Sequence, residues 1–193
     1  MLRKLALLAL LLAPFAASAT SIDISNSGGT LTGNSGGLSL TGSTVFKYDS
    51  IVGPNLGTLT FSTGAFTSGD VQMGGTLAPG GSFQIIGNGM NGAPSGVIFS
   101  GTFSSATWTL VTLDDGTHNY VLSGGLVDAS GHVGATTQIT INTGKALFTG
   151  SSKISSGDTN LSLAVPEPGS LSLLGTGLVG LAGLIYRRRF ARQ

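Results

Sequence analysis

The stretch GVIFSGTFSSATWTLVTLDDGTHNYVLSGGLVD, residues 96–128, holds the densest alternation of apolar and polar residues in this chain of 193 residues. Val97, Phe99 and Phe103 fall on one parity, with polar or small residues between them. A two-residue period is typical of a strand that packs one face and leaves the other in water. We therefore expect strands here and place the centre of the core in this stretch.

A turn signal divides the same stretch. Asp115-Gly116 lies between the apolar run around Trp108 and the run around Tyr120. Asp-Gly favours the tight turn of a β-hairpin, because glycine adopts positive φ without a steric penalty. The pattern predicts a hairpin with Trp108 buried.

Shorter alternating runs occur outward from this hairpin, over residues 38–41, 58–62 and 138–141. No apolar stripe with helical spacing precedes the C-terminal segment. The fold class is therefore all-β, and an antiparallel sandwich or flattened barrel is favoured. An irregular β-solenoid is the alternative, since related glycine-rich motifs recur, but at unequal intervals. They are GGTLTG at 28–33, GGLSLTG at 36–42 and GGTLAPGG at 74–81. Residues 20–36 and 150–164 are polar and glycine-rich enough to be expected as loose arms.

The N-terminus has the composition of a signal peptide. Arg3 and Lys4 precede an apolar run that is too short to span a bilayer. Ala17 and Ala19 then supply the small-x-small pattern that signal peptidase reads. We expect residues 1–19 to be removed by cleavage after Ala19, as the chain enters the general secretion pathway.

The C-terminus has the composition of a membrane anchor. Residues 169–186 are uncharged and mostly apolar, and a helix of that length is about 27 Å long, just enough for the hydrocarbon core of a bilayer. Arg187, Arg188 and Arg189 follow at once and would stop transfer on the cytoplasmic side. The expected organisation is a single transmembrane helix over 169–186 and a basic tail over 187–193, with the preceding body exported.

The body between the two segments is mildly acidic and lacks cysteine. It has three lysines and seven aspartates, a formal charge of −4, and no basic stripe that would hold phosphates. Nucleic-acid binding is therefore not expected. The chain contains no cysteine, so the exported body has no disulfides and depends on packing alone.

Pro166-Glu167-Pro168, a short polar step, an apolar span and a terminal arginine cluster resemble the PEP-CTERM sorting domain. The resemblance implies export, transient anchoring in the inner membrane and processing by an exosortase. It also implies an association with exopolysaccharide or biofilm, and a final location at the cell surface or in the matrix. The expected domains are a signal peptide (1–19), a β ectodomain (20–165) and a sorting segment (166–193) with its motif at 166–168. Two prolines around Glu167 keep this step extended, as a processing enzyme requires.

Catalytic candidates are few. The histidines His118 and His132 have Asp114, Asp115 and Asp128 near them in sequence, but no spacing typical of a metal site or hydrolase. We therefore expect no catalytic residue, metal or cofactor, and interpret Asp114-Asp115-Gly116 as a turn.

Two further short motifs are weak. Residues 87–92, GNGMNG, are glycine-rich but follow no βα pattern that would make a phosphate site. Asn160-Leu161-Ser162 matches a glycosylation sequon.

Three functions remain open from the sequence. The favoured one is a non-catalytic surface or matrix protein, because tryptophan occurs only at Trp108 and a sugar platform requires exposed rings. A surface-exposed carbohydrate-binding or adhesion module is the alternative. An exported hydrolase comes third.

Overall fold

The computed structural model describes residues 20–163 and Gly177. Within residues 20–163 the chain forms twelve strands and one 3-10 turn, η1 (Met90–Gly92). The strands are β1 (Thr20–Ser27), β2 (Thr30–Asn34), β3 (Gly37–Tyr48), β4 (Ile51–Ser62), β5 (Phe66–Asp70), β6 (Gly74–Leu77), β7 (Gly80–Asn88), β8 (Ser95–Thr112), β9 (His118–Asp128), β10 (Val133–Gly144), β11 (Ser151–Lys153) and β12 (Ser156–Leu163).

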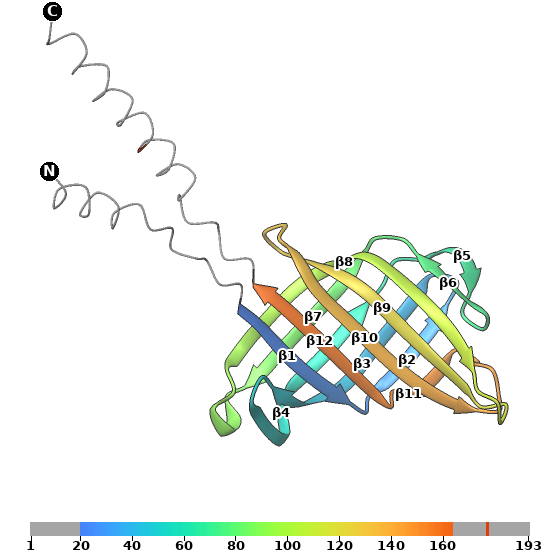
Figure 1. The fold of residues 1–193 in the computed structure, drawn as a ribbon, viewed down its shortest axis with the longest axis horizontal. Helices are drawn as coiled ribbons and strands as arrows, with labels where there is room; N and C mark the ends of the chain where they lie inside the picture. Colours follow the sequence, from blue (N-terminus) through green and yellow to red (C-terminus); the bar gives the residue numbers. More distant parts are fainter. Residues whose placement is uncertain (1–19, 164–176, 178–193) are drawn as a thin grey trace, which may run out of the picture. The chain divides into compact units, whose positions relative to one another are not determined.

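Eight of these strands close into an antiparallel barrel. Hydrogen-bonded neighbours follow the order β1-β12-β10-β9-β8-β7-β4-β3, and β3 pairs with β1 to complete the ring. The predicted all-β class is confirmed, and of the two expected architectures the barrel is found. The solenoid alternative is wrong, because strands far apart in the chain pair with each other, as β1 does with β12 (Figure 1).

Two strands, β3 and β8, change partner along their length, and this accounts for the remaining four strands. β3 pairs with β2 over its first half and with β1 over its second half. β8 pairs with β7 first and then with β6. The β2–β11 pair and the β5–β6 pair therefore extend the sheet where the barrel strands diverge.

The expectation of loose arms at 20–36 and 150–164 is wrong for the described residues. These segments form β1, β2, β11 and β12, and β12 is hydrogen-bonded on both sides, to β1 and to β10. Composition misled because the apolar residues are sparse but correctly phased: Ile24 and Leu161 are buried. Ladder hydrogen bonds on both sides and burial of these side chains together outweigh the entropy of ordering a polar segment.

The predicted central hairpin is confirmed. β8 pairs with β9 from Gly101 to Thr112, and the turn between them contains Asp115 and Gly116, whose φ is 80°. The shared parity of the apolar residues in β8 holds only in part. Phe103 is buried whereas Val97 is exposed, because β8 has one extra residue between Val97 and Phe99 where its register with β7 shifts, and this reverses the face on which alternate residues lie.

The barrel interior is filled by side chains, as expected for a barrel of eight strands. The apolar members of the three short alternating runs are all buried: Leu38, Leu40, Leu59, Phe61, Ile139 and Ile141. Phe61, Phe83 and Phe103 form one aromatic cluster, with ring centroids 5.7–6.1 Å apart. Gly124 makes room for it, since a Cβ there would lie 2.6 Å from the Phe103 ring.

A second aromatic cluster closes one end of the barrel. Trp108 and Tyr120 stack with their centroids 5.1 Å apart, and Phe148 packs against both. The indole Nε1 of Trp108 donates to Val71 O at 2.8 Å, and the hydroxyl of Tyr120 donates to Gln72 O at 2.7 Å. The predicted burial of Trp108 is confirmed, at 1% exposure.

The two ends of the barrel carry different loops (Figure 1). The terminal rim is the end where β1 begins and β12 ends, and it contains the β3–β4 turn, the η1 loop and the β9–β10 turn. The opposite rim contains the β5–β6 turn, the β8–β9 turn and the loop at 145–150. Thr20 is paired with Leu163, so the described chain enters and leaves the barrel side by side at the terminal rim.

Candidate functional site

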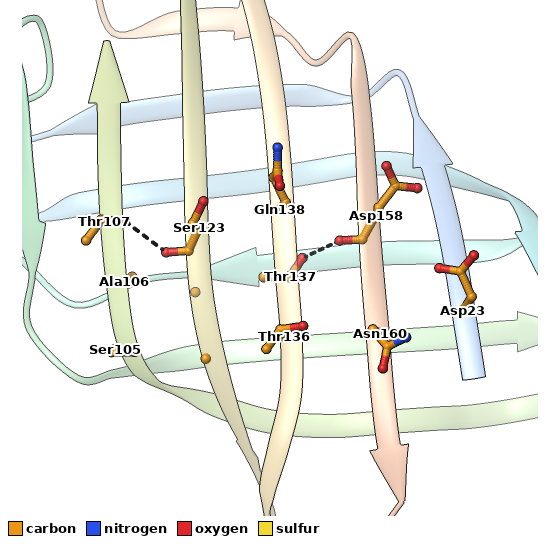
Figure 2. Close-up of a pocket in the computed structure, with 12 residues that line it drawn as sticks. Asp23, Ser105, Ala106, Thr107, Ser123, Thr136, Thr137, Gln138, Asp158 and Asn160 are labelled. Atoms are coloured by element: carbon orange, nitrogen blue, oxygen red, sulfur yellow. Dashed lines mark hydrogen bonds between the residues drawn. The ribbon is translucent and has the colours of Figure 1, made fainter. Parts of the chain in front are cut away.

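A polar groove of about 620 Å³ runs across the outer face of β8, β9, β10, β12 and β1. Its side chains project from these strands, which lie next to one another in Figure 2. The lining residues are Asp23, Ser105, Ala106, Thr107, Ser123, Gly124, Gly125, Thr136, Thr137, Gln138, Asp158 and Asn160.

Strand register builds the groove from two polar rows. Side chains directly opposite each other on adjacent strands share one face of a sheet. One row passes through Thr107, Ser123, Gln138, Asp158 and Ser25 in cross-strand register.

The second row passes through Ser105, Gly125, Thr136, Asn160 and Asp23. Gly125 has no side chain, so the row is lowest at its position. The groove therefore presents hydroxyl, amide and carboxylate groups, and its lowest point is at Gly125.

Each carboxylate in the groove already has a partner. Asp23 Oδ2 lies 2.6 Å from Lys47 Nζ, and its hydrogen bond and charge raise the pKa of that lysine. Asp158 Oδ1 accepts a hydrogen bond from the Ser25 hydroxyl at 2.7 Å. The groove can thus accept and donate hydrogen bonds through Gln138, Asn160 and the hydroxyls. Over the described residues, no group of three or more His, Cys, Asp or Glu side chains is arranged to hold a metal ion.

A second cavity, of about 330 Å³, opens at the terminal rim. Ile98, Phe99, Ala135 and Leu161 give it an apolar wall, and Asp128 and His132 lie beside it in the β9–β10 turn with Ser100, Ala129, Ser130 and Ser162.

The β9–β10 turn is braced by one carboxylate. Asp128 Oδ1 accepts from the backbone N–H of His132 at 2.9 Å and from that of Ser130 at 2.8 Å, while Oδ2 lies 3.0 Å from His132 Nδ1. These bonds favour the charged carboxylate and so hold the pKa of Asp128 below its ordinary value of 3.8. The bond from the His132 backbone N–H has the largest effect. The arrangement stabilises a turn.

The residues considered for catalysis are separated by the fold. His118 begins β9 at the opposite rim, where its Nδ1 lies 3.0 Å from the Thr112 hydroxyl. His132 follows β9 at the terminal rim, so the strand, about 3.3 Å per residue, puts roughly 30 Å between them. Asp114 and Asp115 lie in the β8–β9 turn, just before His118, and Asp115 accepts from the Thr117 N–H at 2.8 Å. Their interpretation as turn residues is confirmed.

The two weaker motifs also have definite places. Residues 87–92 cover the end of β7 and the η1 turn, and the chain continues into β8. Asn160 of the sequon lies on β12 with its side chain exposed in the groove.

The predicted sorting and processing residues lie outside the described residues. They are Ala17, Ala19, Pro166, Glu167, Pro168, Arg187, Arg188 and Arg189. The predicted span at 169–186 also lies outside them, except for Gly177, which is helical. Among the residues that the structure does describe, none belongs to a helix long and apolar enough to cross a membrane. The last strand, β12, ends at Leu163.

Comparison with known families identifies the segment that begins at the next residue. Residues 164–189 match the PEP-CTERM protein-sorting motif. This chain carries a PEP-CTERM sorting motif. The motif indicates an exported protein that is sorted by an exosortase through a membrane-anchored intermediate. The barrel has no family match, and no curated protein or solved structure matches the chain.

Sequence reasoning recognised the PEP-CTERM segment but missed the groove. Its residues are ordinary Ser, Thr, Asn, Gln and Asp at outward positions of separate strands. Their alternation is visible in the sequence, but the polar, glycine-rich composition of the segments that form β1 and β12 predicts arms, so no local signal indicates that five strands present one polar face.

Proposed function

We propose that this protein is an exported, non-catalytic component of the cell surface or extracellular matrix. The PEP-CTERM segment anchors it in the inner membrane with the barrel in the periplasm. An exosortase then cleaves near Pro166-Glu167-Pro168, and the released barrel associates with exopolysaccharide in the biofilm matrix.

The observation that carries the proposal is the junction between barrel and motif. β12 ends at Leu163, and only Ala164 and Val165 separate it from Pro166. Cleavage at the motif would remove none of the paired residues of β12, whose last partner pair is Thr20 and Leu163. The signal therefore follows a completed fold directly, as suits a cargo that is released intact.

The polar groove supports the association with exopolysaccharide. A polyhydroxylated chain needs many hydrogen-bond donors and acceptors, and the groove offers them on five strands. The alternative, a dedicated carbohydrate-binding or adhesion module, rests on the same groove. It is less favoured because no aromatic residue lines the groove, and sugar-binding sites gain much of their contact area from aromatic rings. The hydrolase hypothesis is weakest, because the histidines lie at opposite ends of β9.

The decisive experiment replaces Pro166, Glu167 and Pro168 with alanine in a host that has an exosortase. Export should continue, but the full-length form should accumulate in the membrane fraction, because the extended step that the enzyme reads has been lost. The matched control carries Ser170→Ala and Ser172→Ala, which alter the same segment and leave the motif. A fractionation blot measures both forms. Release of the alanine variant at the rate of the control would overturn the proposed processing.

Binding to the matrix is tested separately with the mature protein and exopolysaccharide purified from the host. Gln138→Ala and Asn160→Ala together remove two amides from the groove. Since a lost hydrogen bond is worth about 0.5–1.5 kcal/mol, retention should fall about 5-fold or more for the pair. Gln84→Ala, an amide on the outer face of β7, is the control. Equal retention of both variants would exclude the groove as the polysaccharide site.

A further inference from the structure

The terminal rim exposes large apolar side chains, most of them on two segments that contain no charged residue. Val52 is 70% exposed, Val97 60% and Met90 55%, and Val133 across the rim is 68% exposed. Val52 belongs to β4, Val97 to β8 and Met90 to the η1 loop between β7 and β8. Ile86, paired with Val97, is 39% exposed on the same outer face.

We name the segments 50–57 and 86–97 the apolar flap. Neither segment contains an Asp, Glu, Lys or Arg. They are joined by a hydrogen bond from Asn88 Nδ2 to Asn55 O at 2.9 Å. A β7–β8 ladder continues from Gly101 to Ser95, beyond the last β8–β9 pair at Gly101. The flap is thus a hydrogen-bonded projection of the barrel.

The charges that border the flap are accounted for. Lys47, opposite Val52 on β3, is paired with Asp23. Asp49 and Asp128 lie in the neighbouring turns, with His132 beside Asp128. The terminal rim therefore presents apolar side chains with a slight excess of negative charge.

The opposite rim has a different pattern, although it also exposes apolar residues. Met73, Leu113 and Leu147 are each within three residues of a charge, at Asp70, Asp114 and Lys145 respectively. At the terminal rim the same is true of Val52, which is three residues from Asp49, but not of Met90 or Val97. Immersing the three side chains of the opposite rim in lipid would carry charged neighbours toward the hydrocarbon, which is costly. Segment 86–97 of the apolar flap could enter a bilayer interface without carrying a charged neighbour in sequence with it, and Val52 of segment 50–57 would bring Asp49 near the headgroups.

The chain leaves the barrel at the terminal rim. From Leu163 to Gly169, where the predicted span begins, there are six backbone steps, which reach about 20 Å at most. A tether this short keeps the lipid surface at a high effective concentration for any part of the rim that can bind it.

We propose that the terminal rim docks on the membrane in the anchored state, with Val52, Met90, Val97 and Val133 in the interfacial layer of a zwitterionic bilayer. The inference rests on the proposed membrane-anchored intermediate and adds a second contact to it. The barrel is then held by its apolar flap as well as by its tether, and release requires that both contacts be broken. Asp49 and Asp128 weaken the contact with anionic lipid.

Depth-dependent quenching tests the docking. The chain contains no cysteine, so one introduced cysteine is the single labelling site. Val97→Cys and Leu113→Cys are labelled with an environment-sensitive fluorophore in the chain with its sorting segment intact, reconstituted in phosphatidylcholine vesicles. Interfacial side chains lie only about 5–10 Å below the headgroups, so the quencher is phosphatidylcholine brominated near the top of its acyl chains. We expect emission from Val97→Cys to fall to about half or less, and that from Leu113→Cys to stay constant.

A substitution series separates docking from mere proximity. With the label at Val133→Cys, the triple change Val52→Ser, Met90→Ser and Val97→Ser should abolish quenching. The matched triple Met73→Ser, Leu113→Ser and Leu147→Ser should leave it unchanged. All six side chains are exposed, so the barrel should fold in both variants, which circular dichroism verifies. Persistence of Val133 quenching in the first triple would mean that the tether alone holds the rim near lipid, and would overturn the proposal.

Three further outcomes are informative. If the parent chain fails to float with the vesicles, the anchored state itself is wrong; if it floats but neither label is quenched, only the docking is wrong. Disulfide trapping between two Val97→Cys chains in place of quenching would show that a second copy covers the flap, and would also overturn the lipid proposal.

Discussion

The two rims of one barrel are stabilised by different interactions. At the opposite rim, buried aromatic rings donate hydrogen bonds to the backbone of the β5–β6 turn, and the Phe148 N–H donates to the Tyr120 hydroxyl at 3.0 Å. At the terminal rim the β9–β10 turn is braced by an Asp128 carboxylate near the surface, and a cavity of about 330 Å³ remains beside it.

The comparison shows that the barrel is closed by strand pairing, whereas its two ends are stabilised separately by their own loops. The loops of the opposite rim fold over the aromatic cluster, so that end contributes to the core. The terminal rim must let two chain ends pass side by side, and its turns satisfy their own polar groups locally. Stability should therefore be concentrated at the opposite rim, and interactions with other molecules at the terminal rim.

The largest effect is expected from Trp108→Ala. Removing a fully buried indole leaves a cavity between Tyr120 and Phe148 and orphans the Val71 carbonyl, so we expect a loss of about 3–5 kcal/mol of unfolding free energy. Denaturant melts of the mature chain measure it. Asp23→Ala, which breaks only a surface ion pair, should change the midpoint very little. Equal midpoints for the two variants would mean that the aromatic cluster of the opposite rim is not a centre of stability.

A smaller effect is expected from Tyr120→Phe. The ring stays, but its hydroxyl joins two backbone groups, Gln72 O and Phe148 N–H. Leaving buried partners unsatisfied costs about 1–3 kcal/mol. Tyr48→Phe, a half-buried tyrosine beside the β3–β4 turn, should cost less in the same melts. A Tyr120→Phe variant as stable as its parent would show that the cap depends on packing alone.

The smallest effect on global stability is expected from Asp128→Asn. Because the pKa of Asp128 is lowered in the folded state, its stabilising contribution is complete above the ordinary value of 3.8 and is lost as pH falls through the folded value. The amide resonances of Ser130 and His132 should therefore shift together in an NMR titration below that pH. Asp128→Asn should abolish this transition, whereas Asp115→Asn, in the opposite-rim turn, should leave it. An unchanged titration in Asp128→Asn would mean that another group controls the turn.

Much of the molecule was predictable from local sequence. The alternation around Trp108 and the Asp115-Gly116 turn predicted a hairpin that the structure contains. The Pro-Glu-Pro step, with its apolar run and arginines, predicted the sorting class. Each of these signals is formed by residues that are close together in sequence, so it can be recognised without knowledge of the fold.

The sequence by itself determined the strand class, the central hairpin and the sorting signal. Only the tertiary structure decided that the barrel closes through β1 and β12, whose partners Thr20 and Leu163 lie at the two ends of the described barrel sequence. Closure in turn aligned the groove across five strands and brought the apolar flap to the rim where the chain leaves. The physical reason is that alternation specifies which face of a strand is buried, whereas the choice of neighbour and register depends on contacts between residues distant in sequence.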